Sequence, residues 1–269
     1  MTMYLRRRAT FSAGLNRPLP GDPGRGHDYL CELTVGGSID PNTGMVINIK
    51  DVDAVLKRRV TGPLGGKLLD TEVAAFRESP ATPENITRYL WDECLEAFGT
   101  QASVARITLW PNLLLKVDLS TLESPHEAPM LTVTRSYDFS ASHRLHSLAL
   151  SDTDNAEVFG KCNWENGHGH NYEFEVTLTG EVDPQTGQLL NLDRLDEIVD
   201  KVVLKPYDHK HLNYDTEDFR TLNPTSENLT KVIWDNLFTQ LSSEPLGGAR
   251  LYRIAVRETA RNYFEYYGD

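Results

Sequence analysis

The residues with the clearest chemical potential are two histidines, His168 and His170, separated by one glycine in the stretch GKCNWENGHGHNYEFEVTLTG (160–180). The alternating pattern after them predicts a β-strand, on which residues i and i+2 face the same side about 6.6 Å apart. That spacing suits two imidazoles that share one metal ion. A lone His-x-His pair also occurs by chance at a polar strand end, so a metal site needs a third ligand.

A third candidate ligand, His143, lies in the preceding stretch FSASHRLH (139–146). Phe139, Ala141 and His143 alternate on one face of a predicted strand. If this strand pairs with the strand that carries His168 and His170, the three imidazoles approach one another. Three neutral imidazoles with an open fourth position are the ligand set of a catalytic Zn²⁺ site. We therefore expect Zn²⁺ at these three residues.

Cys162 stands six residues before His168, and its type allows three interpretations. It is a candidate fourth zinc ligand, which would close the site and make it structural. It is equally a candidate base, because nearby cations favour the thiolate. An inert buried thiol is the commonest fate of a single cysteine.

The elements that must position these residues occur in two copies along the chain. DPNTGMVINI (40–49) matches DPQTGQLLNL (183–192) at five of ten positions, and TPENITRYLWD (82–92) matches TSENLTKVIWD (225–235) at six of eleven, both at an offset of 143. TFSA (10–13) and DFSA (138–141) match at an offset of 128, so the second copy has 143 − 128 = 15 extra residues around Cys162. The repeat predicts two similar domains, 1–125 and 126–269, joined near the Pro/Ser/Glu-rich stretch 118–130.

Each copy predicts the order strand, strand, helix, helix, strand, strand. In the second copy the strands are 130–143, 170–182, 249–260 and 262–268, and the helices are 191–204 and 225–241. Tyr172, Phe174, Val176 and Leu178 are expected on one strand face. Leu192, Leu195, Ile198, Val199 and Val202 are expected on one helix face. The fold class is therefore α+β, with a four-stranded antiparallel sheet and two helices on one face in each copy.

Composition limits the function classes. The 269-residue chain has 39% hydrophobic residues, a net charge of −12 and three well-separated cysteines. The acidic balance argues against nucleic acid as a partner. The lack of a run of about 18 apolar residues argues against a membrane span. The odd number of cysteines argues for a reducing, cytoplasmic location.

The second copy resembles the 6-pyruvoyl-tetrahydropterin synthase family, which has the tunnelling fold. The resemblance rests on FSASHRLH, FGKCNWENGHGHNY, GEVDPQTGQLLNL, LKPYDHKHLN, PTSENLTKVIWDNL and VRETARN, which occur in this order. The spacing Cys-x5-His-Gly-His is similar to the pyruvoyl-forming branch. The resemblance implies that His143, His168 and His170 bind zinc, that Cys162, Asp208 and His209 transfer protons, and that Glu258, Thr225 and Ser226 bind the pterin.

Some of these residues also have structural interpretations. One carboxylate, such as that of Glu258, accepts both a pterin ring N–H and the exocyclic amine. Thr225 and Ser226 also suit a helix N-cap. Asp208 and His209 also suit a surface loop. The implied reaction converts 7,8-dihydroneopterin triphosphate to 6-pyruvoyl-tetrahydropterin with elimination of triphosphate. A 6-carboxytetrahydropterin synthase and a non-catalytic zinc- or pterin-binding scaffold are the alternatives.

The first copy lacks most of these residues. Leu15 stands in place of His143, Arg25 in place of His168, and Gly65 and Gly66 in place of Asp208 and His209. Only His27 remains, in place of His170, and Pro111 aligns near Glu258. We expect a non-catalytic domain that is kept for architecture. In the family, sheets of several subunits join into a barrel, so a homo-oligomer of three or more chains is expected.

Overall fold

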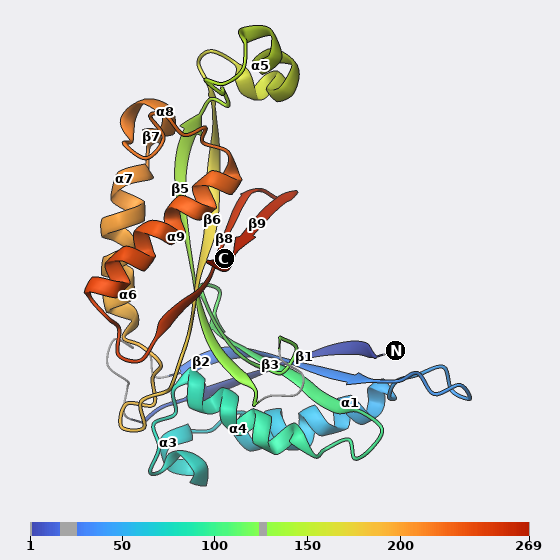
Figure 1. Ribbon diagram of the computed structural model, residues 1–269. Coiled ribbons are helices and arrows are strands. Elements are labelled where there is room, and N and C mark those ends of the chain that lie inside the picture. The colour runs from blue at the N-terminus through green and yellow to red at the C-terminus, as the bar shows by residue number, and fades with distance from the viewer. Residues whose placement is uncertain (1, 17–25, 124–127, 269) are drawn as a thin grey trace. The chain divides into compact units, whose positions relative to one another are not determined.

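The computed structural model describes residues 2–16, 26–123 and 128–268 (Figure 1). The chain forms two compact units: unit 1 extends to Thr134 and includes Thr179–Leu189, and unit 2 comprises Arg135–Leu178 and the chain from Leu190 onward. The predicted domain boundary near residue 125 and the predicted counterpart of His168, Arg25, lie outside the described residues. Within the described ranges, no helix has the length and apolar character needed to cross a bilayer.

Unit 1 contains an antiparallel sheet in the order β1-β2-β3-β4, formed by β1 (Met3–Gly14), β2 (Gly26–Gly37), β3 (Ser103–Asn112) and β4 (Leu115–Ser120). Its main helices are α1 (Ile49–Val55) and α4 (Pro83–Leu95). A π-helical turn η1 (Leu56–Thr61) and α2 (Gly62–Leu64) continue α1, and the short elements α3 (Leu69–Glu72) and η2 (Ala74–Phe76) precede α4. Helix α4 packs on β3 and β4.

Unit 2 has the same arrangement, with the strand order β5-β6-β8-β9. The strands are β5 (Met130–His143), β6 (His168–Thr179), β8 (Arg250–Thr259) and β9 (Asn262–Tyr266). A two-residue strand, β7 (Lys210–His211), pairs in parallel with β5. Helix α6 (Leu192–Val199), the π-helical turn η4 (Asp200–Leu204), α7 (Lys205–Tyr207) and α9 (Ser226–Ser243) lie along one side of this sheet (Figure 1). The predicted α+β class and the element order are thus confirmed.

The core of unit 2 follows the predicted strand pattern. Tyr172, Phe174, Val176 and Leu178 of β6 are each at most 1% exposed. Aromatic packing continues to β5, because the Phe139 ring stacks on Tyr172 with a centroid separation of 5.1 Å. The alternation of apolar residues on β5 and β6 therefore fixes which residues of both strands face the helices, and it sets the direction of the histidines further along the strands.

The helix face that contains Val202 was predicted incorrectly. Val203, not Val202, is buried, together with Leu195, Ile198 and Val199. The reason is the π-helical turn η4, since a π-turn adds a residue and advances the buried face by one position. Val60 is buried in the corresponding π-turn η1 of unit 1, so both repeats keep this irregularity.

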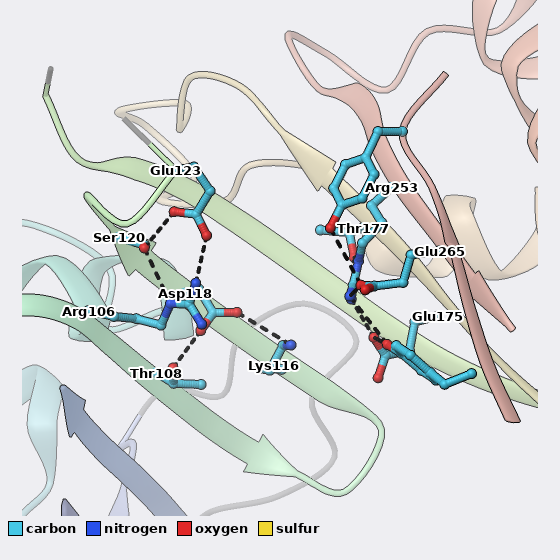
Figure 2. Close-up of polar contacts among 12 residues, drawn as sticks. Arg106, Thr108, Lys116, Asp118, Ser120, Glu123, Glu175, Thr177, Arg253 and Glu265 are labelled. Carbon is cyan, nitrogen blue, oxygen red and sulfur yellow. Dashed lines mark hydrogen bonds and ion pairs between the residues drawn. The ribbon is translucent and has the colours of Figure 1, made fainter. Parts of the chain in front are cut away.

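One arginine ties neighbouring strands together in each unit (Figure 2). In unit 2, the Arg253 guanidinium on β8 pairs with Glu175 on β6 and with Glu265 on β9. In unit 1, Arg106 on β3 donates to Glu123 Oε1 at 2.6 Å and to Ser120 Oγ at 3.2 Å. Arg253 is only 13% exposed, so the sheet of unit 2 contains a largely buried charge that depends on these carboxylates.

The extra residues of the second repeat form a small helical insert that the sequence did not predict. It contains α5 (Asp152–Phe159) and the 3₁₀ turn η3 (Gly160–Asn163). Asn155 is fully buried and organises the insert, because its amide nitrogen donates to the carbonyls of Ser147, Leu150 and Ser151. The insert delivers Cys162 within η3.

Candidate active site

The three predicted ligands meet at the ends of β5 and β6. His143, His168 and His170 offer ligand nitrogens that all lie within 4.8 Å of one another. His143 Nε2 and His168 Nε2 are 3.2 Å apart, and the three ring centroids are separated by 4.6 to 5.2 Å. The register of two adjacent strands is what brings a residue of one strand to a His-x-His pair of the other.

A backbone carbonyl fixes the His143 ring. Its Nδ1 lies 2.7 Å from Pro224 O, so Nδ1 carries the proton and donates it, which leaves the Nε2 lone pair directed at the other histidines. His143 is fully buried, and burial lowers its pKa to about 4. Burial also lowers the pKa of His168, with a further contribution from the nearby His170. The lowered pKa values favour the neutral form of His143 and His168, the form in which imidazole binds a metal.

The donor set fits a divalent metal. His168 Nδ1 and His170 Nε2 are buried ring nitrogens without a hydrogen-bond partner among the described residues. A buried polar atom without a partner is costly, and a metal ion would satisfy imidazole lone pairs at this position. Among the described residues, the convergent ligand group consists of the three histidines. Cys162 Sγ is outside it.

Glu258 on β8 borders the histidine cluster. Its Oε1 lies 3.7 Å from His143 Nε2 and 3.8 Å from His170 Nε2. Oε1 accepts from Ser226 Oγ at 2.9 Å, and Oε2 accepts from Asn262 Nδ2 at 2.9 Å. Burial alone would raise the pKa of Glu258, but these two donors and the nearby imidazoles hold it below the ordinary value. The carboxylate is therefore charged and held in one orientation.

Two roles were predicted for Thr225 and Ser226 at the start of α9, helix capping and pterin binding, and the two residues differ in their contacts. Thr225 is the N-cap, and its Oγ1 accepts from Asn228 N at 3.3 Å. Ser226 is buried and binds Glu258. Thr225 thus has the capping role that the sequence left open, whereas Ser226 reaches the candidate site.

Asp208 and His209 form a side-chain pair, with 2.9 Å between Asp208 Oδ2 and His209 Nδ1. Asp208 Oδ1 accepts from Ser140 N, and His209 N donates to Ser140 O, so this turn is fastened to β5. The bond from Ser140 N, followed by that from His209, lowers the pKa of Asp208. The imidazole is 82% exposed and free to meet a ligand.

His209 adopts an unusual backbone conformation. Its φ is +57°, and it is the one non-glycine residue with positive φ in the described ranges. The corresponding residue of unit 1 is Gly66, with φ +72°, and Gly66 N donates to Ser12 O as His209 N donates to Ser140 O. The turn thus favours glycine, and the second repeat keeps a histidine at a cost in strain, which is typical of functional positions.

An open cavity of about 560 Å³ is lined by both His170 of the histidine cluster and His209. Its lining includes three further polar residues that the sequence reasoning did not identify as functional, Asn171, His211 and Asp215. Both ring nitrogens of His211 are buried without a partner among the described residues. The polar run DHKHLNYD was the available signal, but spacing alone does not show which of its side chains enter the cavity.

Four cations lie near this region in the sequence, Arg144, Lys161, Lys205 and Lys210, and their surroundings differ. Lys210 lines the cavity. Arg144 donates to Asn163, and Lys205 pairs with Asp200 at 2.6 Å. Lys210 is therefore the cation that borders the space available to a ligand.

Unit 1 has a corresponding cavity, but only one of its lining residues is a histidine. Its cavity of about 340 Å³ is lined at the corresponding positions, by Ser12, Ala13, Gly14, Gly26, His27, Asp28, Gly66, Lys67 and Leu68. Leu15, the counterpart of His143, is 4% exposed and belongs to the hydrophobic core. A single imidazole in this cavity cannot form the three-nitrogen ligand set of the second repeat.

Comparison with known proteins agrees with this description. A family model described as 6-pyruvoyl tetrahydropterin synthase matches residues 19–116 and 132–269. The chain is 46% identical over 142 residues to a 6-pyruvoyl tetrahydrobiopterin synthase of Drosophila melanogaster, covering 53% of this chain and 82% of the relative. A 6-carboxy-5,6,7,8-tetrahydropterin synthase of Bacillus subtilis is 31% identical over 137 residues, covering 48% of this chain and 86% of the relative.

Among solved structures, the 6-pyruvoyl tetrahydropterin synthase of Caenorhabditis elegans is 43% identical, with a TM-score of 0.49, and covers 52% of this chain and 97% of that chain. The Drosophila melanogaster relative covers about half of this chain, which agrees with a chain that contains the family's domain twice. Because the family model matches both repeats and most of the sequence, this chain belongs to the 6-pyruvoyl tetrahydropterin synthase family.

Proposed function

We propose that the chain is a zinc-dependent lyase that converts 7,8-dihydroneopterin triphosphate to 6-pyruvoyl-tetrahydropterin and triphosphate. The observation that carries this proposal is the convergence of three imidazoles beside an oriented carboxylate, with one of the three, His170, lining an open cavity. The C-terminal repeat, 126–269, is the catalytic domain in this proposal. The N-terminal repeat, 1–125, has no catalytic role.

His143, His168 and His170 would hold the Zn²⁺ ion, whose charge would polarise the side-chain hydroxyl groups of the substrate. Glu258 would accept the ring N–H and the exocyclic amine of the pterin. Ser226 and Asn262, which already donate to this carboxylate, keep it oriented for that contact. Leaving such a carboxylate unpaired would cost about 1–3 kcal/mol.

Proton transfer would use Cys162, Asp208 and His209, of which His209 lines the cavity. Cys162 as thiolate would remove a proton from the substrate side chain, and His209, oriented by Asp208, would act as its partner acid or base. The reaction needs no external oxidant, because moving protons shifts the oxidation level from the ring to the side chain while triphosphate leaves. The substrate is a small pterin triphosphate, and Lys210 is the cavity cation placed to meet its negative charge.

The test is to incubate the zinc-loaded protein with 7,8-dihydroneopterin triphosphate and to identify the product by mass spectrometry. A product that keeps the three-carbon side chain supports the proposal. A one-carbon carboxylate with released acetaldehyde identifies the 6-carboxytetrahydropterin reaction instead, and no turnover identifies a non-catalytic scaffold.

Matched variants locate the site. His170→Ala is expected to lose both zinc and turnover, whereas His27→Ala, at the corresponding position of the N-terminal repeat, is expected to keep both. Loss of turnover in both variants would contradict the assignment of catalysis to the second repeat.

A further inference from the structure

A contact inside unit 1 joins parts of the two repeats. The loop of the second repeat, 183–189, packs on the N-terminus of α4. Thr82 Oγ1 donates to Gly187 O at 2.5 Å, and the carboxylate of Glu84 accepts from Leu189 N at 3.0 Å. Thr82 and Glu84 are 0% and 6% exposed, so this is a tight, buried contact between a preformed loop and a helix end.

The corresponding loop of the first repeat, 40–46, has the same internal structure. Asp40 Oδ1 accepts from Asn42 N at 2.7 Å and Thr43 N at 2.9 Å, as Asp183 Oδ1 accepts from Gln185 N at 2.8 Å and Thr186 N at 2.9 Å. Gly44 and Gly187 have φ +69° and +70°. The first loop is therefore built for the same kind of contact.

The helix end of the second repeat also has the same structure. Thr225 caps α9 with φ −69° and ψ 159°, and Thr82 caps α4 with φ −72° and ψ 159°. Glu227 follows Thr225 at the spacing at which Glu84 follows Thr82. Asn228 and Asn85 both donate from Nδ2 to the carbonyl five residues upstream, that of Asn223 and that of Pro80 respectively.

Loop 40–46 and the N-terminus of α9, the second pair of a loop and a helix end, are both more exposed than their counterparts in the buried contact. Gly187 is buried, and a Cβ placed on it would lie 2.5 Å from Asn85 Nδ2, whereas Gly44 is exposed and a Cβ on it meets nothing within 4 Å. Glu227 is exposed where Glu84 is buried. Ile39 is 47% exposed, whereas the corresponding Val182 is 8% exposed.

We propose that a second molecule of this chain completes the exposed pair: loop 40–46 of one molecule docks on the N-terminus of α9 of the next. By correspondence with unit 1, the Thr225 hydroxyl donates to the Gly44 carbonyl of the neighbour, and the Glu227 carboxylate accepts from the Val46 N–H of the neighbour. The two surfaces differ, so the contact is head-to-tail and repeats from chain to chain until a ring closes.

The contact has a consequence for the candidate site. Ser226 lies between Thr225 and Glu227 in sequence and donates to Glu258 at 2.9 Å. A neighbour docked on this helix end therefore supports the backbone that orients the pterin-binding carboxylate. This gives the N-terminal repeat a physical role that does not require its own catalytic residues.

The first test is the solution mass by light scattering at tens of micromolar protein. The wild type is expected to be an assembly of several chains. Gly44→Asn is expected to weaken the assembly by about tenfold or more, because its side chain would meet Asn228 of the neighbour and displace bonds to a charged acceptor. Gly99→Asn is the matched control, since Gly99 also has positive φ, +57°, and open space at Cβ.

The second test does not depend on a destabilising substitution. The double variant Gly44→Cys/Asn228→Cys, in a Cys162→Ser background, is expected to form chain-to-chain disulfides on mild oxidation, whereas each single substitution does not. A single-chain wild type, an unchanged mass for Gly44→Asn, or a double variant that forms no cross-link would overturn the proposal. Both readouts are independent of turnover, so they stand apart from the proposed reaction.

Discussion

The left-handed backbone of His209 allows stability and activity to be separated by one substitution. Changing His209→Gly relieves a conformation that costs an ordinary residue about 1–2 kcal/mol. The greater freedom of glycine in the unfolded chain offsets about 0.5–1 kcal/mol of that gain. The side-chain contact with Asp208 contributes little to stability, because the imidazole is 82% exposed and its partner 42% exposed. We therefore expect the free energy of unfolding to rise by about 0–1.5 kcal/mol.

Activity is expected to move in the opposite direction. If His209 is the acid or base of the proposed reaction, its removal lowers kcat by about 10²–10⁴-fold. The assay pairs thermal unfolding with product formation at saturating substrate. At about 2–4 °C per kcal/mol, the melting temperature is expected to stay unchanged or to rise by a few degrees.

The reciprocal substitution in the N-terminal repeat is the control. Gly66 has φ +72° at the corresponding turn, so Gly66→His is expected to lose stability by the same margin and to leave kcat unchanged. The reasoning is refuted if His209→Gly destabilises the protein by more than about 1 kcal/mol, or if it retains wild-type turnover.

Three further predictions follow from the site and its supports. A Cβ on Gly167, whose φ is +69°, would lie 2.6 Å from His143 O. Gly167→Ala is therefore expected to weaken zinc binding without removing a ligand. An unchanged zinc affinity in a metal-competition titration would contradict this prediction. Arg253→Leu leaves carboxylates on two neighbouring strands unpaired, so it is expected to lower the free energy of unfolding by about 2 kcal/mol in a denaturant titration. An unchanged midpoint would show that the ion pairs of Arg253 do not contribute to stability. The pKa of His143 is about 4 in the folded protein, below the value of about 6.5 in the unfolded chain, so the folded state binds fewer protons between these values. The metal-free protein is therefore expected to lose stability as the pH falls from about 6.5 towards 4. His143→Leu, which places in the second repeat the residue type of Leu15, is expected to flatten this dependence of stability on pH. An equally steep dependence in the variant would show that protonation of His143 is not its cause.

The sequence predicted those features that depend on a short-range pattern. The alternation of Tyr172, Phe174, Val176 and Leu178 defines the buried face of β6, and the same alternation carries on to His168 and His170. The 143-residue repeat indicated two similar α+β modules before any fold was known. These signals are strong because a one-residue change in strand register would expose the whole apolar set.

Other features depend on backbone events that residue types do not encode locally. The π-turn η4 advances the buried helix face from Val202 to Val203, and an ideal 3.6-residue period cannot anticipate it. The strain at His209 appears only when φ is known. The contact of His143 Nδ1 with Pro224 O joins residues 81 positions apart, so the tautomer of this ligand follows from the tertiary fold and not from the motif.

The metal content of the purified chain tests the central claim most directly. We expect one zinc ion per chain by elemental analysis, with loss of that ion in His143→Leu and its retention in His27→Ala. Two ions per chain, or a full complement in the His143→Leu variant, would contradict the account that three imidazoles at the ends of β5 and β6 form the one metal site of this protein.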